Sequence, residues 1–150
     1  MVVSAPHATR PLRNGRRRFS DGAGTAALAI AIGQLTGATI IHTIAEGPSD
    51  PNYYDDNTYK ERLGKLLEAI QPSIVIDVHG SHPFRSYDVD LGTMGGASLL
   101  GNLELLDHLV ESLEDEGFAS ISFNRFGASE NETVTTVSYT HLTLPTKRIV

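Results

Sequence analysis

Apolar residues along the chain occur in two kinds of segment, short β-branched runs and longer stretches with helical spacing. The short runs predict four strands, at residues 2–5, 38–44, 73–78 and 118–123. The longer stretches predict three helices, at residues 22–35, 57–70 and 99–116. Segments rich in glycine, proline and polar residues separate them, at residues 6–20, 46–56 and 80–98. This alternation of strands and helices predicts an α/β fold.

Two patterns refine the predicted fold. Ile74, Val75 and Ile76 are apolar on consecutive positions, which is typical of a parallel strand covered on both faces. In the first helix, Leu28 and Leu35 fall on one face with Ile32, and we expect that face to pack on the sheet. Together these patterns favour a three-layer α/β/α sandwich with a mainly parallel sheet.

Length and composition narrow the class of protein. The chain has 150 residues, of which 40% are hydrophobic and 20% charged, as expected for one globular domain. It contains no cysteine, which excludes disulfides, thiolate metal sites and cysteine nucleophiles. Its apolar runs are too short to span a membrane, and its first residues do not resemble a secretory signal. We therefore expect a cytoplasmic protein that does not interact with membranes.

Basic residues are concentrated near the N-terminus, although the net charge is −6. Five of the twelve Lys and Arg residues fall within nine positions: Arg10, Arg13, Arg16, Arg17 and Arg18. This segment is either a solvated loop or a positive rim that attracts an anion. The net acidity, and the lack of aromatic residues within the cluster, argue against a nucleic-acid partner.

Two histidines directly follow predicted strands. His7 comes after the first strand, and His79 comes after the third. Because ligands bind beyond the carboxyl ends of parallel strands, we expect both imidazoles at the same edge of the sheet. Two imidazoles and a carboxylate form a typical catalytic zinc site, which leaves one position open for water. The alternative is that each histidine is a strand-end residue hydrogen-bonded to a loop.

Three residues are candidates for the third zinc ligand, and the sequence leaves the choice open. Asp21 precedes the first helix, where it is also a good N-cap. Asp77 lies two residues before His79, a position better suited to orienting that imidazole. His82 is the third candidate.

Five stretches, in this order and spacing, resemble the N-formylglutamate amidohydrolase family. They are residues 4–15, 21–25, 49–54, 76–82 and 88–93. The resemblance implies a fold similar to that of the zinc carboxypeptidases, and hydrolysis of a small acidic N-acyl amino acid. It also implies zinc on His7 and His79, with Asp21 as the match for the acidic ligand. Substrate contacts would come from Arg10, Asn52 and Arg85, so the expected partner is a small anionic substrate.

The chain departs from this family near its end. Family members continue past a Thr-rich stretch like residues 132–136 to a Gln-Leu-Glu segment, whose glutamate is the expected general base. This sequence has no such segment, and residues 137–150 resemble a translated sequencing adapter. We therefore expect residues 1–136 to be a partial amidohydrolase-like domain, residues 137–150 to be a non-native tail, and activity to be weak or absent. The alternatives are a non-catalytic anion-binding α/β module that uses the Arg10–Arg18 loop, and an α/β domain with purely structural histidines.

Overall fold

The computed structural model describes residues 1–21, 23–126, 133 and 134. The described residues belong to two compact units. The first unit consists of Met1–Ser81 with Thr133 and Val134, and the second lies within His82–Glu130. The predicted non-native tail lies outside the described residues.

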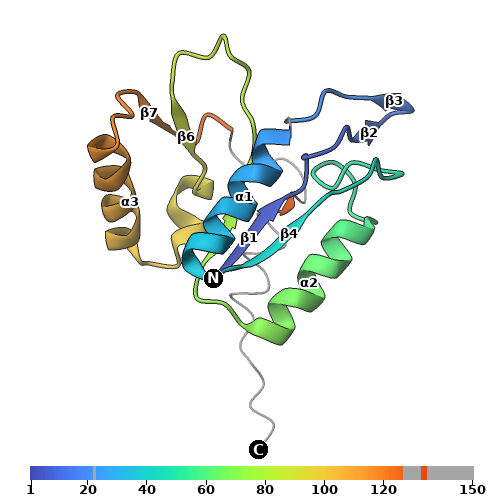
Figure 1. The fold of residues 1–150 in the computed structure, drawn as a ribbon, viewed down its shortest axis with the longest axis horizontal. Coiled ribbons are helices and arrows are strands. Elements are labelled where there is room, and N and C mark those ends of the chain that lie inside the picture. The colour runs from blue at the N-terminus through green and yellow to red at the C-terminus, as the bar shows by residue number, and fades with distance from the viewer. Residues whose placement is uncertain (22, 127–132, 135–150) are drawn as a thin grey trace, which may run out of the picture. The chain divides into compact units, whose positions relative to one another are not determined.

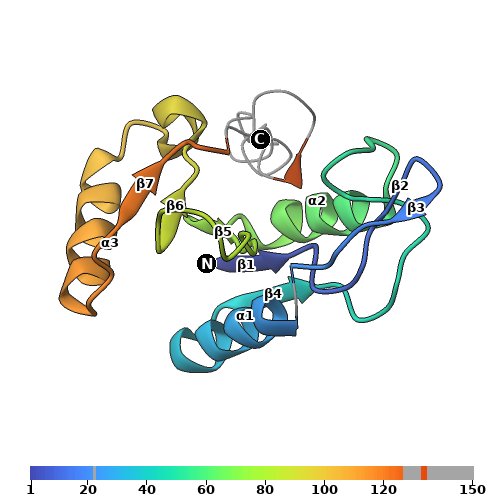
Figure 2. The ribbon, with the colours of Figure 1, turned by 90° about the horizontal axis from the view of Figure 1, so that it is seen from above.

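The first unit is built on a three-stranded parallel sheet with strand order β4-β1-β5; Figure 1 labels β1 and β4, and Figure 2 labels all three strands. Its elements in chain order are β1 (Val2–Ala5), β2 (Leu12–Arg13), β3 (Arg16–Arg17), α1 (Ala23–Thr36), β4 (Thr39–His42), α2 (Thr58–Ile70) and β5 (Val75–Asp77). The central strand, β1, is fully buried along its length, as expected for a strand covered on both faces. The predicted strands and helices of this part of the chain are thus confirmed, with slightly shorter strands.

The two helices pack on opposite faces of this sheet (Figure 2). Val3 and Ala5 of β1 pack against Ala29 of α1. Val2, the neighbour of Val3, points the other way and packs against Leu63 and Leu67 of α2. This alternation follows from the two-residue period of side chains along a strand.

Of the three residues predicted on one face of α1, Ile32 packs against the core of the sheet, but the other two do not lie on the buried face. Leu28 and Leu35 are 51% and 86% exposed, whereas Thr25, Ala29 and Gly33 are buried. These three residues are four positions apart and small, so the helix backbone approaches the sheet closely. A Cβ atom on Gly33 would lie 2.2 Å from Cδ1 of Ile40 in β4. The prediction failed because α1 is apolar on all sides, so that hydrophobic periodicity does not identify its inner face.

The arginine-rich segment was predicted to be an irregular loop, but it contains an antiparallel hairpin formed by β2 and β3. Asn14 and Gly15 join the two strands with φ angles of 52° and 72°. Two consecutive positive φ values are characteristic of the two-residue hairpin turn that Asn-Gly favours. The backbone N–H of Arg18 donates to the carbonyl of Pro11 at 2.9 Å and extends the pairing.

Residues 82–126 of the second unit contain the further elements β6 (Val89–Leu91), the 3-10 helix η1 (Met94–Leu99), α3 (Leu103–Asp115) and β7 (Ile121–Phe123). The prediction of one long loop at residues 80–98 was wrong, because β6 and η1 lie within it. Strand β7 pairs in parallel with β6, so the described strands do not form the single mainly parallel sheet that was predicted. The class is α/β in both units.

None of the helices in the described part of the chain has the length and apolar character that crossing a membrane requires.

Candidate metal centre

The sheet brings His7 and His79 to one edge. The strands that precede them, β1 and β5, are hydrogen-bonded neighbours, and Ser4 is in register with Asp77. The N–H of Val78 also donates to the carbonyl of Ser4 at 2.7 Å, which continues the pairing towards His79. Because the strands are parallel and in this register, both histidines lie at the same carboxyl edge of the sheet, where ligands of open α/β sheets bind.

Asp21 completes a cluster with the two imidazoles. Its Oδ2 lies 2.9 Å from Nδ1 of His79 and 3.5 Å from Nδ1 of His7. The two rings stand edge to face with their centroids 5.1 Å apart. One ligand atom from each of the three residues lies within 4.8 Å of the others. Two nitrogens and one carboxylate oxygen at this spacing match the ligand set of a catalytic zinc site.

Backbone packing holds Asp21 in this position. Its N–H donates to the carbonyl of His7 at 3.0 Å. Gly80, the residue after His79, lies against Asp21, and a Cβ atom there would come within 2.6 Å of the carbonyl oxygen of Asp21. The absence of a side chain at position 80 therefore permits the close approach of Asp21 and His79.

The outer nitrogen of each imidazole contacts a second carboxylate. Nε2 of His7 lies 2.8 Å from Oδ1 of Asp50, and Nε2 of His79 lies 3.0 Å from Oδ2 of Asp77. Both Nε2 atoms therefore point away from Asp21, and both Nδ1 atoms face it. Metal-binding histidines commonly have such a partner, which fixes the tautomer and the ring orientation.

Asp50 is the functional residue that sequence reasoning missed. Its side chain has no exposed surface, and its Oδ2 accepts hydrogen bonds from Arg13 at 2.7 and 3.0 Å. The stretch 49–54 was part of the family resemblance, but spacing gives no sign of a contact between residues 43 positions apart. The position of Asp50 beside Pro51, in a loop that follows a strand, was the only signal in the sequence.

The carboxylates change the pKa values of the imidazoles. Burial alone would lower the pKa of His79, but the charges of Asp77 and Asp21 and the hydrogen bonds to them raise it to about 10. The pKa of His7 is also raised, since hydrogen bonds to Asp21 and Asp50 outweigh its burial. Conversely, burial would raise the pKa of Asp21 and of Asp50, but the histidines hold both below the usual range. The centre without metal therefore binds protons where a cation would bind.

The candidates for the third ligand differ in position. Asp21 faces both Nδ1 atoms, whereas Asp77 contacts the outer nitrogen of His79. Oδ1 of Asp77 is buried and lacks a hydrogen-bond partner in the described part of the chain. His82 belongs to the second unit, where its ring packs against Phe84. Of the three candidates, the described geometry brings Asp21 together with His7 and His79.

The predicted substrate-binding residues have different surroundings. Nδ2 of Asn52 lies 3.0 Å from Nε2 of His79, so Asn52 adjoins this histidine on the side that faces away from Asp21. Its Oδ1 accepts a hydrogen bond from the N–H of Val134. Arg10 is exposed on the hairpin side, where its Nε donates to the carbonyl of Arg18. Arg85 belongs to the second unit, and its guanidinium stacks on the ring of Phe126.

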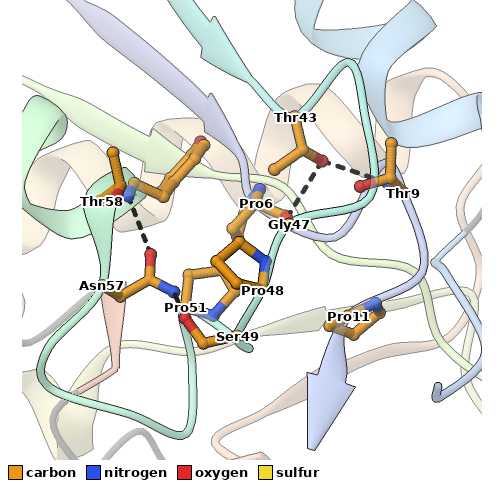
Figure 3. A pocket seen from close by; sticks show the side chains of 11 residues that line it. Pro6, Thr9, Pro11, Thr43, Gly47, Pro48, Ser49, Pro51, Asn57 and Thr58 are labelled. Atoms are coloured by element: carbon orange, nitrogen blue, oxygen red, sulfur yellow. Dashed lines mark hydrogen bonds between the residues drawn. The ribbon is translucent and has the colours of Figure 1, made fainter. Parts of the chain in front are cut away.

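A small cavity of about 90 Å³ lies beside the loop that carries Asp50 (Figure 3). Prolines line much of it, including Pro48 and Pro51, and Asn57 closes one side by hydrogen bonding to Ser49. None of the three clustered residues lines this cavity. It is mainly apolar and none of the residues that line it is charged, so it does not extend the cluster of His7, Asp21 and His79.

Comparison of the whole chain with models of protein families, with curated proteins and with solved structures gives no match. The geometry of the centre is therefore the main evidence for function.

Proposed function

We propose that the chain binds zinc through Nδ1 of His7, Nδ1 of His79 and the carboxylate of Asp21. The observation that carries this proposal is the convergence of three ligand atoms within 4.8 Å, with both outer nitrogens on carboxylates. An arrangement that only satisfied the hydrogen bonds of strand-end histidines would not require all three groups to face one point. The donor set also suits zinc, which prefers imidazole and carboxylate ligands where thiolates are absent.

The reaction that this centre supports is hydrolysis of the amide bond of a small N-acyl acidic amino acid, in the manner of the N-formylglutamate amidohydrolases. Bound zinc would polarise the carbonyl and lower the pKa of a water molecule. The protein would hold the two Nδ1 atoms in place through Asp50 and Asp77. Asn52, beside His79, is the proposed substrate contact nearest the centre. Arg10 and Arg85 are further proposed contacts with the substrate carboxylates.

The proposed fold is a three-layer α/β/α sandwich of the zinc-exopeptidase type. The packing of α1 and α2 on opposite faces of the parallel sheet supports this proposal, and so does the position of the histidines at the strand ends.

Metal binding and turnover are separate parts of the proposal. No Gln-Leu-Glu segment occurs in the 150 residues, so the glutamate expected to act as general base is not among them. We therefore expect this chain to bind zinc and to hydrolyse N-acyl amino acids weakly or not at all.

The test is a zinc titration of the purified protein, with metal content measured after dialysis. We expect about one zinc per chain, and loss of that zinc in His7→Ala and in His79→Ala. His42→Ala and His108→Ala are matched controls, because His42 bonds to a backbone carbonyl and His108 lies on an exposed helix. Absence of zinc from the folded wild-type protein, or its retention in both test variants, would overturn the proposal.

A further inference from the structure

Residues of the β2–β3 hairpin and its flanks line a second hollow, which combines arginine side chains with an aromatic ring. This open hollow of about 250 Å³ is lined by Arg10, Arg17, Arg18 and Phe19. In the described residues, none of these side chains makes a hydrogen bond or ion pair with His7, Asp21 or His79. The hollow is therefore distinct in composition and contacts from the proposed zinc centre.

The hairpin backbone holds these arginines together. Nη1 of Arg17 donates to the carbonyl of Gly47 at 2.6 Å and to that of Arg10 at 3.2 Å. Arg10 in turn donates from Nε to the carbonyl of Arg18 at 3.4 Å. These hydrogen bonds link Arg10, Arg17 and Arg18, and all three line the same hollow. Their like charges repel one another there.

Carboxylates neutralise only part of this charge. Asp50 pairs with Arg13, and Glu46 pairs with Arg17 at 3.3 Å. Among the described residues, no carboxylate lies within 4.0 Å of the guanidinium of Arg10, Arg16 or Arg18. An oxyanion in the hollow would relieve the repulsion, and guanidinium groups bind planar oxyanions through paired hydrogen bonds.

An apolar group lies beside these charges. Phe19 lines the same hollow and is 97% exposed. A phenyl ring left this open to water contributes nothing to folding, because its apolar surface is not buried. A ligand that carries an apolar part next to its charge would cover the ring.

We propose that this hollow binds a small oxyanion, a carboxylate or a phosphate, that carries an apolar or aromatic group. Two or more guanidinium groups hold the oxyanion, and Phe19 contacts the apolar part. This binding function does not depend on zinc, although Arg10 is also a proposed substrate contact of the hydrolase.

The test follows the arginine Nε–H signals of the protein by NMR during titration with phenyl phosphate and with 3-phenylpropionate. Inorganic phosphate and acetate serve as probes without an apolar group. We expect saturable shifts at Arg10, Arg17 and Arg18, and at least about tenfold weaker binding in Arg18→Gln, a loss of about 1.4 kcal/mol. Arg18→Lys keeps the charge but loses the paired hydrogen bonds, so it should also weaken binding. Phe19→Ser should abolish the preference for the phenyl compounds.

Arg16→Gln is the matched control. It removes the same charge from the same hairpin, but Arg16 does not line the hollow. Arg16→Gln alters only the general positive potential, so it should change the affinity for the oxyanion probes less than about twofold. Equal weakening in Arg16→Gln and Arg18→Gln, or no saturable shift with any probe, would overturn the inference. Because the variants are exposed, far-UV circular dichroism should match that of the wild type. Zinc content is measured on the same samples, so a failure of the zinc proposal is seen separately.

Discussion

Nε2 of His7 lies 2.8 Å from Oδ1 of Asp50, a carboxylate with no exposed surface. Arg13 pairs with the other oxygen of Asp50 and makes it a fully occupied acceptor. The orientation of the His7 imidazole thus depends on a residue from a different loop. A change at Asp50 should therefore alter zinc affinity.

Replacing Asp50 with asparagine should weaken zinc binding. The amide would keep the shape of the side chain but remove the charge that fixes the imidazole, and loss of such a partner typically costs about 10–100-fold in metal affinity. The substitution also leaves Arg13 without its carboxylate. The stability loss should stay below the about 3–5 kcal/mol of fully buried pairs, because Arg13 is partly exposed. Competitive zinc titration and urea unfolding measure the two effects.

Glu46→Gln is the control for Asp50→Asn, because Glu46 also pairs with an arginine of the hairpin but is largely exposed. It should leave zinc affinity unchanged. Unchanged zinc affinity in folded Asp50→Asn would show that Asp50 does not support the metal centre.

Replacing Gly80 with alanine should displace Asp21. The added Cβ would lie 2.6 Å from a backbone oxygen, which cannot move aside as the end of a side chain can. We expect a stability loss of about 1–3 kcal/mol, typical of overpacking, and weaker zinc binding.

Gly47→Ala is the corresponding control, since its nearest neighbour would be 3.8 Å away. Thermal unfolding measures the stability of the two variants, and zinc titration measures their zinc affinity. Wild-type zinc affinity in Gly80→Ala would contradict the role assigned to this glycine.

The stability of the metal-free protein should fall as pH rises above neutrality. The pKa of His79 is about 10 in the folded state, and an unfolded histidine has a pKa of about 6.5. Its stabilising contribution is therefore complete below pH ~6.5 and is lost as pH rises towards ~10. The stabilising contribution of His7 is also lost as pH rises, because its pKa is raised in the folded state. Asp21 and Asp50, whose pKa values are lowered, contribute above their unfolded pKa of about 3.9 and lose that contribution in acid.

Urea unfolding in the presence of a chelator, measured from pH 4 to 10, tests this profile. His79→Gln should flatten the alkaline side, whereas His42→Gln should not. Zinc should reverse the trend, because protons compete with the metal for the imidazoles and zinc affinity rises as they leave. A metal-free protein whose stability stays constant between pH ~6.5 and ~10 would contradict the assigned pKa shift.

Two glycines of α1 should respond in opposite ways to alanine. Gly33→Ala would place a Cβ 2.6 Å from Cγ1 of Ile40 and 3.2 Å from the backbone oxygen of Ala38, so moving only the end of the Ile40 side chain does not make room, and we expect a loss of about 1–3 kcal/mol. In Gly24→Ala the added Cβ would have no atom within 4 Å. Because alanine loses less conformational freedom than glycine on folding, this substitution should stabilise the helix by about 0.5–1 kcal/mol. Equilibrium unfolding of both variants tests whether α1 packs through its small residues. Equal effects would mean that another face of α1 meets the sheet.

Local sequence patterns predicted most strands and helices of the first unit, but not its β2–β3 hairpin. The β-branched runs identified β1 and β4, and the apolar spacing identified α2, because these patterns reflect burial on a fixed period. Asn14-Gly15 is a strong hairpin signal, yet the surrounding polar residues led to the prediction of a loop. Strand β6 has three residues and no distinctive pattern, so nothing local separated it from the loop around it.

The sequence by itself determined that His7 and His79 follow strands, and parallel strands carry such residues to a common edge. Spacing placed Asp77 beside His79, and the structure confirms this contact, but spacing could not determine that Asp50 would meet His7 or that Asp21 would meet both rings. Asp21, Asp50 and Asp77 reach the two rings from three different segments, and only the pairing of β1 with β5 and the packing of the intervening loops bring them together. Contacts between residues far apart in the chain depend on how complete elements pack, a property that short stretches of sequence do not encode.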